Sequence, residues 1–253
     1  ELDEAPMLYI GEKLGTKNGP DIDIAVDPLE GTNFAAYNLP GALSVIAIAE
    51  KNNLFKAPET YMEKISANVH EKEVVDLDYS IKKNIYNLSD YLNKKPEDLT
   101  ACIMDRPRHN SIIKELNNLK VKIKLITDGD VSGALLVTDK KYNVDIFLGI
   151  GGGPEGVLAA SALDAYECAF QGRFLFVTDE DKIRAKKMGI KNLKKKYELN
   201  EIVSGDSIFC ATGITSGDLL NGIVIKDKNF ISETLVTHKS SKLKKIIKME
   251  EKI

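Results

Sequence analysis

Apolar residues in the first part of the chain form short blocks of β-prone residues, separated by Gly, Pro and Asn. These blocks predict strands at residues 22–26, 43–49 and 54–56. Further on, the apolar residues recur with the period of a helix (Ile81, Ile85, Leu88, Leu92). The pattern therefore predicts a strand-rich first part that is followed by a helix over residues 81–92.

Beyond residue 100 the predicted strands and helices alternate. We expect strands at residues 100–104, 121–126, 144–148, 207–211 and 230–237. We expect helices at residues 109–119, 131–137, 155–165 and 179–188. This alternation predicts an α/β fold with a parallel or mixed sheet covered by helices. It also divides the chain into an N-terminal subdomain, residues 1–75, and a C-terminal α/β subdomain, residues 76–253, whose last strands return to the first sheet.

Composition narrows the class of protein. The 253 residues carry a net charge of -3, with 29% charged residues, so nothing favours binding to nucleic acid or to a membrane surface. No apolar run is long enough to span a bilayer. Three cysteines without metal-site spacing indicate reduced thiols, as in a cytoplasmic protein. The Lys-rich segment 239–249 is expected to be a solvated face or an edge strand.

The stretch Asp27-Pro28-Leu29-Glu30-Gly31-Thr32 is the most informative motif, because it closes the first predicted strand and opens a helical segment. Two carboxylates about a Pro-induced bend, a Gly and a hydroxyl are the groups that a Mg²⁺ or Mn²⁺ site holding a phosphate requires. The same residues are equally consistent with a capped strand–turn–helix junction, in which Thr32 would be the N-cap.

A Gly-rich stretch, residues 149–156, follows the predicted strand 144–148 and opens the next helix. Its backbone N–H groups predict an anion site at the helix N-terminus, and Pro154 suits the first helical turn. Glu155 could hold a metal near a bound phosphate. Its residue type alone favours the simpler role of a first-turn acid facing the helix dipole.

Polar residues also follow two other predicted strands. Arg106 and Arg108 flank Pro107 after residues 100–104 and suit a phosphate clamp. Asp128, Gly129 and Asp130 follow residues 121–126, at the end of a strand where ligands bind in α/β sheets. These two acids could bind a cation or sugar hydroxyls, or Asp130 could be the N-cap of the next helix. Tyr61 and His109 are expected to be packing residues.

The residues favour hydrolysis by an activated water over covalent catalysis. The sequence shows no Ser-His-Asp or Cys-His arrangement, and it contains three His residues. Metals at Asp27, Glu30 and Glu155 would neutralise phosphate oxygens and lower the pKa of a water molecule that attacks phosphorus in line.

Taken together, the motifs resemble those of one known family. The matching segments, in the family's order, are residues 3–13, 27–32, 57–64, 106–109, 128–131, 149–156 and 211–215. The chain resembles the class II fructose-1,6-bisphosphatases of bacteria, in the lithium-sensitive phosphatase superfamily. That resemblance implies a layered α/β/α/β/α fold of two α/β subdomains, with the active site in the cleft between them.

The resemblance also implies roles for individual residues. It makes Asp27, Glu30 and Glu155 metal ligands, with Asp27, Glu30 and Thr32 as the catalytic set. Thr32 would supply the catalytic hydroxyl and Tyr61 a hydroxyl in the substrate pocket. The implied substrate-binding residues are Glu30, Gly31, Thr32, Tyr61, Arg106, Pro107, Arg108, Asp128, Gly129, Asp130 and Gly152. In the family a further segment with metal-binding acids precedes this point and Glu1 matches one of them, so we expect the sequence to be part of a longer protein.

We therefore predict a cytoplasmic, Mg²⁺- or Mn²⁺-dependent phosphatase. It would remove the 1-phosphate of fructose 1,6-bisphosphate in gluconeogenesis, and we expect a homo-oligomer. Sedoheptulose 1,7-bisphosphate is an alternative substrate, because it presents the same phosphate. An inositol phosphatase is less consistent with a second phosphate site at Arg106 and Arg108. A non-catalytic sugar-phosphate-binding protein is the alternative from another class.

Overall fold

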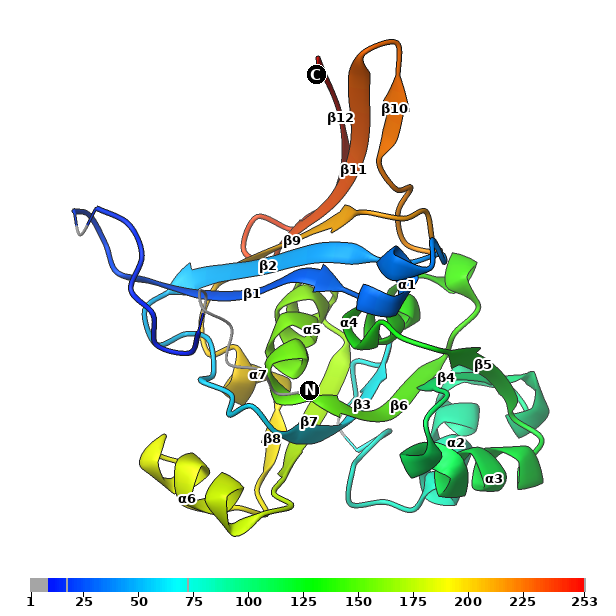
Figure 1. The fold of residues 1–253 in the computed structure, drawn as a ribbon. Coiled ribbons are helices and arrows are strands. Elements are labelled where there is room, and N and C mark those ends of the chain that lie inside the picture. The colour runs from blue at the N-terminus through cyan, green and yellow to red at the C-terminus, as the bar shows by residue number, and fades with distance from the viewer. Residues whose placement is uncertain (1–8, 17, 72, 253) are drawn as a thin grey trace.

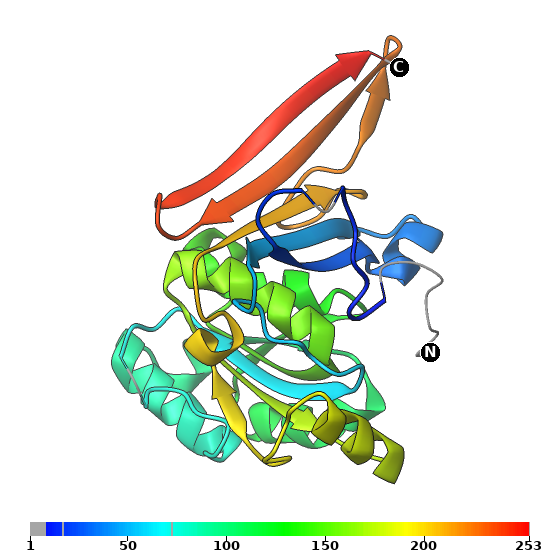
Figure 2. The same cartoon turned by 90° about the vertical axis from the view of Figure 1, so that its left-hand side faces the viewer.

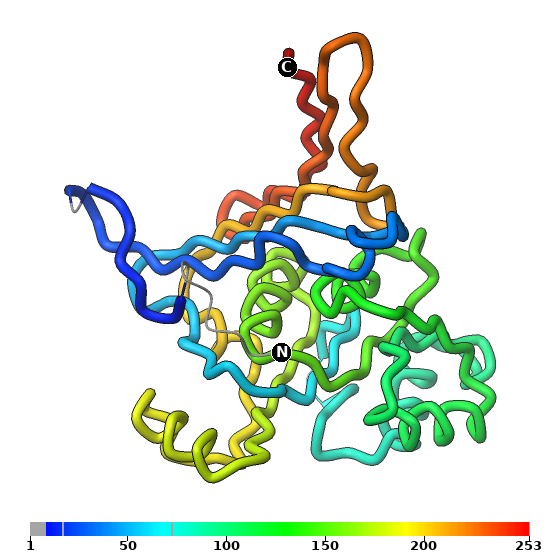
Figure 3. The backbone as a smooth tube through the Cα atoms, in the orientation of Figure 1, coloured from blue at the N-terminus to red at the C-terminus, as the bar shows by residue number. Residues whose placement is uncertain are grey.

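Two six-stranded sheets stack with helices between them (Figure 1). The computed structural model describes residues 9–16, 18–71 and 73–252. The chain crosses from the first sheet to the second between residues 50 and 61, and it returns between residues 198 and 207 (Figure 3). The predicted α/β class is confirmed. The change of sheet precedes residue 61, whereas the predicted subdomain boundary was placed at residue 75, and a division into subdomains stays a prediction.

The first sheet combines both ends of the described chain. Its strands are β1 (Ile22–Glu30), β2 (Leu43–Glu50), β9 (Ser207–Gly213), β10 (Val224–Lys226), β11 (Asn229–His238) and β12 (Leu243–Lys252). All neighbours in it are antiparallel. The strands predicted at 22–26, 43–49, 207–211 and 230–237 are therefore confirmed. Residues 54–56 are not a strand, since Leu54 makes only an isolated bridge to Val203.

The second sheet is mixed, in the order β5-β4-β6-β3-β7-β8. Its strands are β3 (Tyr61–Ala67), β4 (Thr100–Met104), β5 (Lys122–Ile126), β6 (Ile146–Gly152), β7 (Ala169–Leu175) and β8 (Lys196–Glu198). Strands β5, β4 and β6 run parallel, as the alternating pattern predicted. Strand β3 lies in the middle of this sheet and was not predicted, because its polar residues interrupt the apolar pattern.

The helices are α1 (Thr32–Ala36), α2 (Ile81–Leu92), α3 (Asn110–Asn118), α4 (Asp130–Leu135), α5 (Gly153–Tyr166), α6 (Asp179–Lys187) and α7 (Leu199–Ile202). Helix α5 is buried on nearly every side because it lies between the two sheets. Helices α2 and α3 cover the other face of the second sheet with Ile85, Leu88 and Leu116. Among the described residues, no helix is long and apolar enough to cross a membrane.

The described residues therefore form four layers of the α/β/α/β/α series that the resemblance implied. Figures 1 and 2 show helices α4 and α5 on one face of the first sheet and no described helix over its other face. Ile22, Ile24 and Ile208 on that outer face are each more than 40% exposed. Strands β10, β11 and β12, residues 224–252, extend beyond the body, and we call them the arm (Figure 2).

Candidate active site

The predicted site residues gather where strands from both sheets end. Arg106 and Arg108 follow β4, Asp128 and Asp130 follow β5, and Glu155 follows β6. These three strands are parallel neighbours, so the residues after them meet at one edge of the second sheet. The end of β1 brings Asp27 and Glu30 to the same place from the first sheet. Glu1, which the resemblance matched to a metal-binding acid, lies outside the described residues.

Strand β1 runs through the motif to Glu30 and does not end at Val26. Asp27 pairs with Val45 and Glu30 with Leu43, so two residues of β1 face one of β2 between these pairs, and the strand bulges there. Proline is tolerated at position 28 because the bulge interrupts the pairing there, and proline has no N–H to pair. The Asp27 carboxylate accepts a hydrogen bond from the Leu29 N–H at 3.0 Å. The bulge therefore places the carboxylates of Asp27 and Glu30 close together at the end of β1.

Helix α1 opens directly after the bulge. Gly31 precedes it with φ at +77°, and a Cβ at this residue would also clash with the Phe34 ring, so glycine is required. Thr32 is the first residue of the helix, with Gly31 as the N-cap, so the alternative that Thr32 caps the helix is wrong. Thr32 is exposed. Its hydroxyl makes no hydrogen bond to the residues that the structure describes, which leaves it available to a ligand.

Two carboxylates connect the two sheets, because each accepts hydrogen bonds from the start of a helix that follows a strand of the other sheet. Glu30 accepts hydrogen bonds from the backbone N–H groups of Val131 and Ser132, at the start of α4. Asp128 accepts one from the Asn33 N–H at the start of α1, at 3.3 Å. Gly129 is the N-cap of α4, so Asp130 is its first residue and not its cap. Glu30 thus has the structural role of holding α4 against β1, in addition to any role toward a ligand.

Glu30 is 3% exposed, and its Oε2 has no hydrogen-bond partner among the described residues. Burial, against the opposing effect of its backbone hydrogen bonds, raises the pKa of Glu30 to about 8. Burial is also the main reason why the pKa values of Asp27 and Glu155 are raised. Nearby acids add to each shift, Asp128 at Asp27 and Asp130 at the two glutamates. The site therefore concentrates acids whose negative form is disfavoured by burial and by one another, and which the described chain only partly compensates.

Lys64 supplies part of that compensation and was missed from the sequence. Its side chain is 1% exposed, and its ammonium forms an ion pair with the Oδ2 of Asp130. The charge of Lys64 also opposes the raised pKa of Glu155. The other oxygen of Asp130, Oδ1, has no partner among the described residues. A lysine between the inward-facing Met62 and Ser66 would have indicated this role, had β3 been recognised.

The Gly-rich stretch is mostly strand, which corrects the predicted turn. Strand β6 continues to Gly152 and pairs with β3 along its length, so the stretch is not an open set of N–H groups. The Ile150 N–H donates to His109 and the Gly153 N–H to the Thr60 carbonyl, each at 2.8 Å. Helix α5 then begins at Gly153, with Pro154 and Glu155 in its first turn, as predicted.

Two of these glycines make room for carboxylates. A Cβ at Gly151 would clash with the carboxylate of Asp130, and a Cβ at Gly152 would clash with that of Glu155. A side chain at either position would displace an acid of the site. The glycines are therefore required less for a turn than for this close approach.

The arginine pair lies on the same edge with partners of its own. Arg108 donates through Nε to the Ile150 carbonyl at 2.8 Å, and its guanidinium lies 4.9 Å from the centre of the Tyr61 ring. Arg106 lies 3.9 Å from Asp128. Tyr61 is 47% exposed, so the expectation that it is a buried core residue is wrong. These contacts hold the arginines beside the acids without covering them.

His109 has a structural role, as expected. It is fully buried, with Nδ1 at 2.7 Å from the Met104 carbonyl and Nε2 accepting from the Ile150 N–H. Burial lowers the pKa of His109, which favours the neutral ring that these two bonds require. It ties the end of β4 to the end of β6.

The acids of the site fit a divalent cation by their chemistry. All are oxygen donors, and two buried oxygens, Glu30 Oε2 and Asp130 Oδ1, have no partner among the described residues. Within residues 9–16, 18–71 and 73–252, however, no three Asp, Glu, His or Cys side chains are grouped closely enough to form a metal site. The assignment of Asp27, Glu30 and Glu155 as ligands stays a prediction.

The stability of the metal-free protein should fall as the pH rises. Glu30 titrates near its ordinary 4.5 when unfolded and near 8 when folded, so the folded state is favoured below pH 4.5 and loses that advantage progressively up to about pH 8. A shift of one pKa unit corresponds to about 1.4 kcal/mol, so the loss should reach several kcal/mol.

Urea unfolding in the presence of a chelator, measured from pH 4.5 to 8.5, tests this expectation. Glu30→Gln stays neutral at every pH and is the matched control. As the pH rises, its free energy of unfolding should therefore increase relative to that of the wild type. A difference between the two proteins that does not change with pH would contradict the raised pKa.

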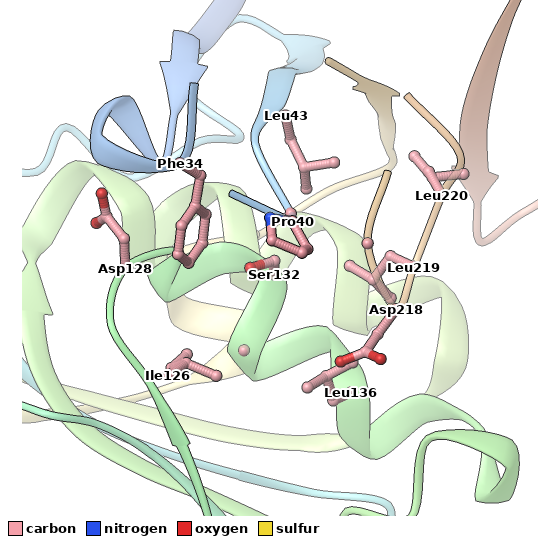
Figure 4. A pocket seen from close by; sticks show the side chains of 13 residues that line it. Phe34, Pro40, Leu43, Ile126, Asp128, Ser132, Leu136, Asp218, Leu219 and Leu220 are labelled. Atoms are coloured by element: carbon pink, nitrogen blue, oxygen red, sulfur yellow. The ribbon is translucent and has the colours of Figure 1, made fainter. Parts of the chain in front are cut away.

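A pocket of about 210 Å³ adjoins the site (Figure 4). Its lining is mainly apolar and comes from α1, the start of β2, the end of β5, α4 with the turn after it, and the loop before β10. Phe34, Leu43 and Leu136 are among these residues. Asp128 is the one predicted site residue in its lining, beside Phe34. The pocket therefore extends away from the acids, and none of them except Asp128 lines it.

Comparison with known proteins identifies the group to which these features are similar. Residues 1–251 match the family model described as bacterial fructose-1,6-bisphosphatase, glpX-encoded. The chain is 40% identical to the fructose-1,6-bisphosphatase class 2 of Haemophilus influenzae, over 97% of this chain and 78% of that protein. It is also similar to two proteins named D-fructose 1,6-bisphosphatase class 2/sedoheptulose 1,7-bisphosphatase. For that of Synechocystis the identity is 40%, over 88% of this chain and 72% of the relative, and for that of Synechococcus strain JA-3-3Ab it is 39%, over 95% and 76%.

Proposed function

The chain belongs to the glpX-encoded bacterial fructose-1,6-bisphosphatases, a family of metal-dependent phosphatases, and we propose that it removes the 1-phosphate of fructose 1,6-bisphosphate. The products would be fructose 6-phosphate and phosphate, a step of gluconeogenesis. The observation that carries this proposal is the family match over nearly the whole chain. The oxygen-rich edge with two arginines beside it is consistent with a phosphorylated substrate.

In this proposal, different residues of the site bind the reacting phosphate, the sugar and the phosphate that does not react. A cation held by Asp27, Glu30 and Glu155 would neutralise charge on the reacting phosphate and make a water molecule more acidic. Thr32 would orient that water, since its hydroxyl is exposed at the start of α1. Asp128 and Asp130 would accept hydrogen bonds from sugar hydroxyls, with Lys64 holding Asp130 in place.

Arg108 would bind the phosphate that does not react, together with Arg106. Arg108→Ala should then raise KM far more than it lowers kcat, because this contact is equal in the ground and transition states. Loss of one charged hydrogen-bonding partner corresponds to about 1.5–3 kcal/mol. Steady-state kinetics with fructose 1,6-bisphosphate measure the split.

Arg184→Ala on α6 is the matched control, since Arg184 is exposed and lies on a helix that supplies none of the site residues. It should leave both constants unchanged. A collapse of kcat in Arg108→Ala with an unchanged KM would place Arg108 at the reacting phosphate instead.

Phosphate release from a panel of sugar bisphosphates, with Mg²⁺, Mn²⁺ or a chelator, tests the proposed function. We expect release from fructose 1,6-bisphosphate that the chelator abolishes, and enzymatic detection of fructose 6-phosphate as the product. Tight binding of the sugar bisphosphate without release under any metal would favour the non-catalytic alternative.

Sedoheptulose 1,7-bisphosphate is a second candidate substrate, because the relatives from Synechocystis and Synechococcus are named for the two activities. We further propose Mg²⁺ or Mn²⁺ as the cation, from the oxygen donors, and a cytoplasmic location. The three cysteines are unpaired in the described structure, which is consistent with that location. We also propose that the protein is a homo-oligomer.

A further inference from the structure

Strand β12 leaves one complete edge of the first sheet unpaired by any described residue. It pairs with β11 over residues 243–252, and no described strand follows it on its other side. All of its described side chains are exposed, including Ile246, Ile247 and Met249 at more than 40%. It lies in the arm, which extends beyond the body of the molecule (Figures 1 and 2). A long exposed edge with apolar residues is a site for pairing with another strand.

We propose that this edge pairs antiparallel with β12 of a second copy of the chain, which joins the two first sheets into one continuous sheet. The inference does not depend on the phosphatase activity. It rests on the free edge and on the order of charges along β12, which is basic at its start (Lys244, Lys245) and acidic near its end (Glu250, Glu251). Two copies that run in opposite directions bring these segments together, whereas parallel copies would oppose like charges.

Symmetry restricts the register. A two-fold axis that relates antiparallel edge strands of one sheet stands perpendicular to that sheet, so each face stays on its own side. Side chains alternate between faces along a strand, so directly opposed residues must both be even-numbered or both be odd-numbered. Two such registers pair nine of the ten residues of β12, one centred on Ile247 and the other on Lys248, and any other register pairs seven or fewer.

The charges select the register centred on Ile247. In it, Ile247 lies opposite Ile247 of the partner subunit, and Lys244 lies opposite the partner's Glu250, twice by symmetry. No like charges within β12 are then directly opposed. The register centred on Lys248 pairs Lys245 with the partner's Glu251, but it also sets Lys248 against its own copy and Lys244 against the partner's Lys252. Like charges opposite each other destabilise a sheet, and opposite charges stabilise it.

Neighbouring residues support an apolar centre for this contact. Ile247 and Met249 lie on the same face of β12, which is also the face of Thr234 and Ser232 of β11. In the proposed register the two Ile247 residues and the two Met249 residues form one group across the axis. The lysines of the edge, which would oppose association of parallel copies, lie around this group.

Charge exchange tests the proposal in sedimentation equilibrium. Lys244→Glu or Glu250→Lys alone opposes like charges twice and should weaken dimerisation at least about tenfold. The double variant, with both changes, restores the opposite pairs and should recover dimerisation to within about threefold of the wild type. Lys228→Glu, at the tip of the β10–β11 turn, is the control for the change in net charge and should have no effect.

Cysteine cross-linking tests the register. In Ile247→Cys the two thiols face each other across the axis, within reach of a disulfide or a short cross-linker, and a covalent dimer is expected. Lys248→Cys should cross-link only in the alternative register, and the wild type controls for Cys102, Cys168 and Cys210. A wild type that is monomeric at all concentrations, a double variant that does not recover, or an Ile247→Cys variant that forms oligomers without cross-linking would overturn the proposal.

Discussion

Asp27→Asn should nearly abolish turnover and leave the fold intact. The change removes one unit of negative charge from the residues that we expect to hold the cation, on which the reaction depends. The fold should persist because Asn retains an oxygen for the Leu29 N–H, which Asp27 binds at 3.0 Å. Burial also raises the pKa of Asp27, so a neutral side chain is not penalised there. Turnover at saturating metal and far-UV circular dichroism measure the two parts of this expectation.

Asp23→Asn is the matched control for this variant. Asp23 lies on the same strand and the same face as Asp27 and is also half-buried. Its carboxylate accepts a hydrogen bond from the Leu54 N–H at 3.3 Å, away from the predicted acids. It should keep wild-type turnover. If Asp27→Asn is nearly as active as Asp23→Asn at saturating metal, Asp27 is not a metal ligand.

Thr32→Ala should slow the chemical step by about 10²–10⁴, the usual contribution of a positioned group that takes part in proton transfer. Metal and substrate binding should change little, because a hydroxyl does not attract a cation as a carboxylate does. The structure sharpens this prediction, since Gly31 and not Thr32 caps α1. The alanine variant should therefore not lose stability through a missing cap. Single-turnover rates and the free energy of unfolding separate the two effects.

Thr32→Ser retains the hydroxyl and should recover most of the lost rate. Equal losses in the alanine and serine variants would mean that the Thr32 methyl group packs against something the reaction needs and that its hydroxyl is not used. A loss of stability in Thr32→Ala that matches its loss of activity would point to the same conclusion.

Local patterns in the sequence determined much of the fold. The helices at 81–92 and 179–187 and the strands at 43–50 and 100–104 lie within a residue or two of their predicted positions. Helix α2 and the two strands have apolar residues at a clear period, and the two helices begin at caps, Ser80 before α2 and Thr178 before α6. The residues after β4, β5 and β6 were each predicted to bind a ligand, and the parallel order of these strands brings them to one edge.

Contacts between distant residues decided the rest. Strand β3 was missed because its buried Lys64 is stable only beside Asp130, an ion pair that joins two different elements. Tyr61 was expected in the core, but it is exposed beside Arg108, which comes from another strand end. Glycines 151 and 152 were expected in a turn, yet they continue a strand and make room for carboxylates of two helices.

By itself, then, the sequence determined the types of most elements, the family and the set of polar residues that gather at one edge. These follow from hydrophobic period, turn chemistry and motif order, which are properties of neighbouring residues. Only the tertiary structure decided that Glu30 binds the start of α4, that Lys64 neutralises Asp130, and that β11 is the one described strand with which β12 pairs. Each of these depends on which segments the fold brings into contact, some of them about a hundred residues apart in the sequence. Burial at such contacts sets the charge state of a group more strongly than its sequence neighbours do.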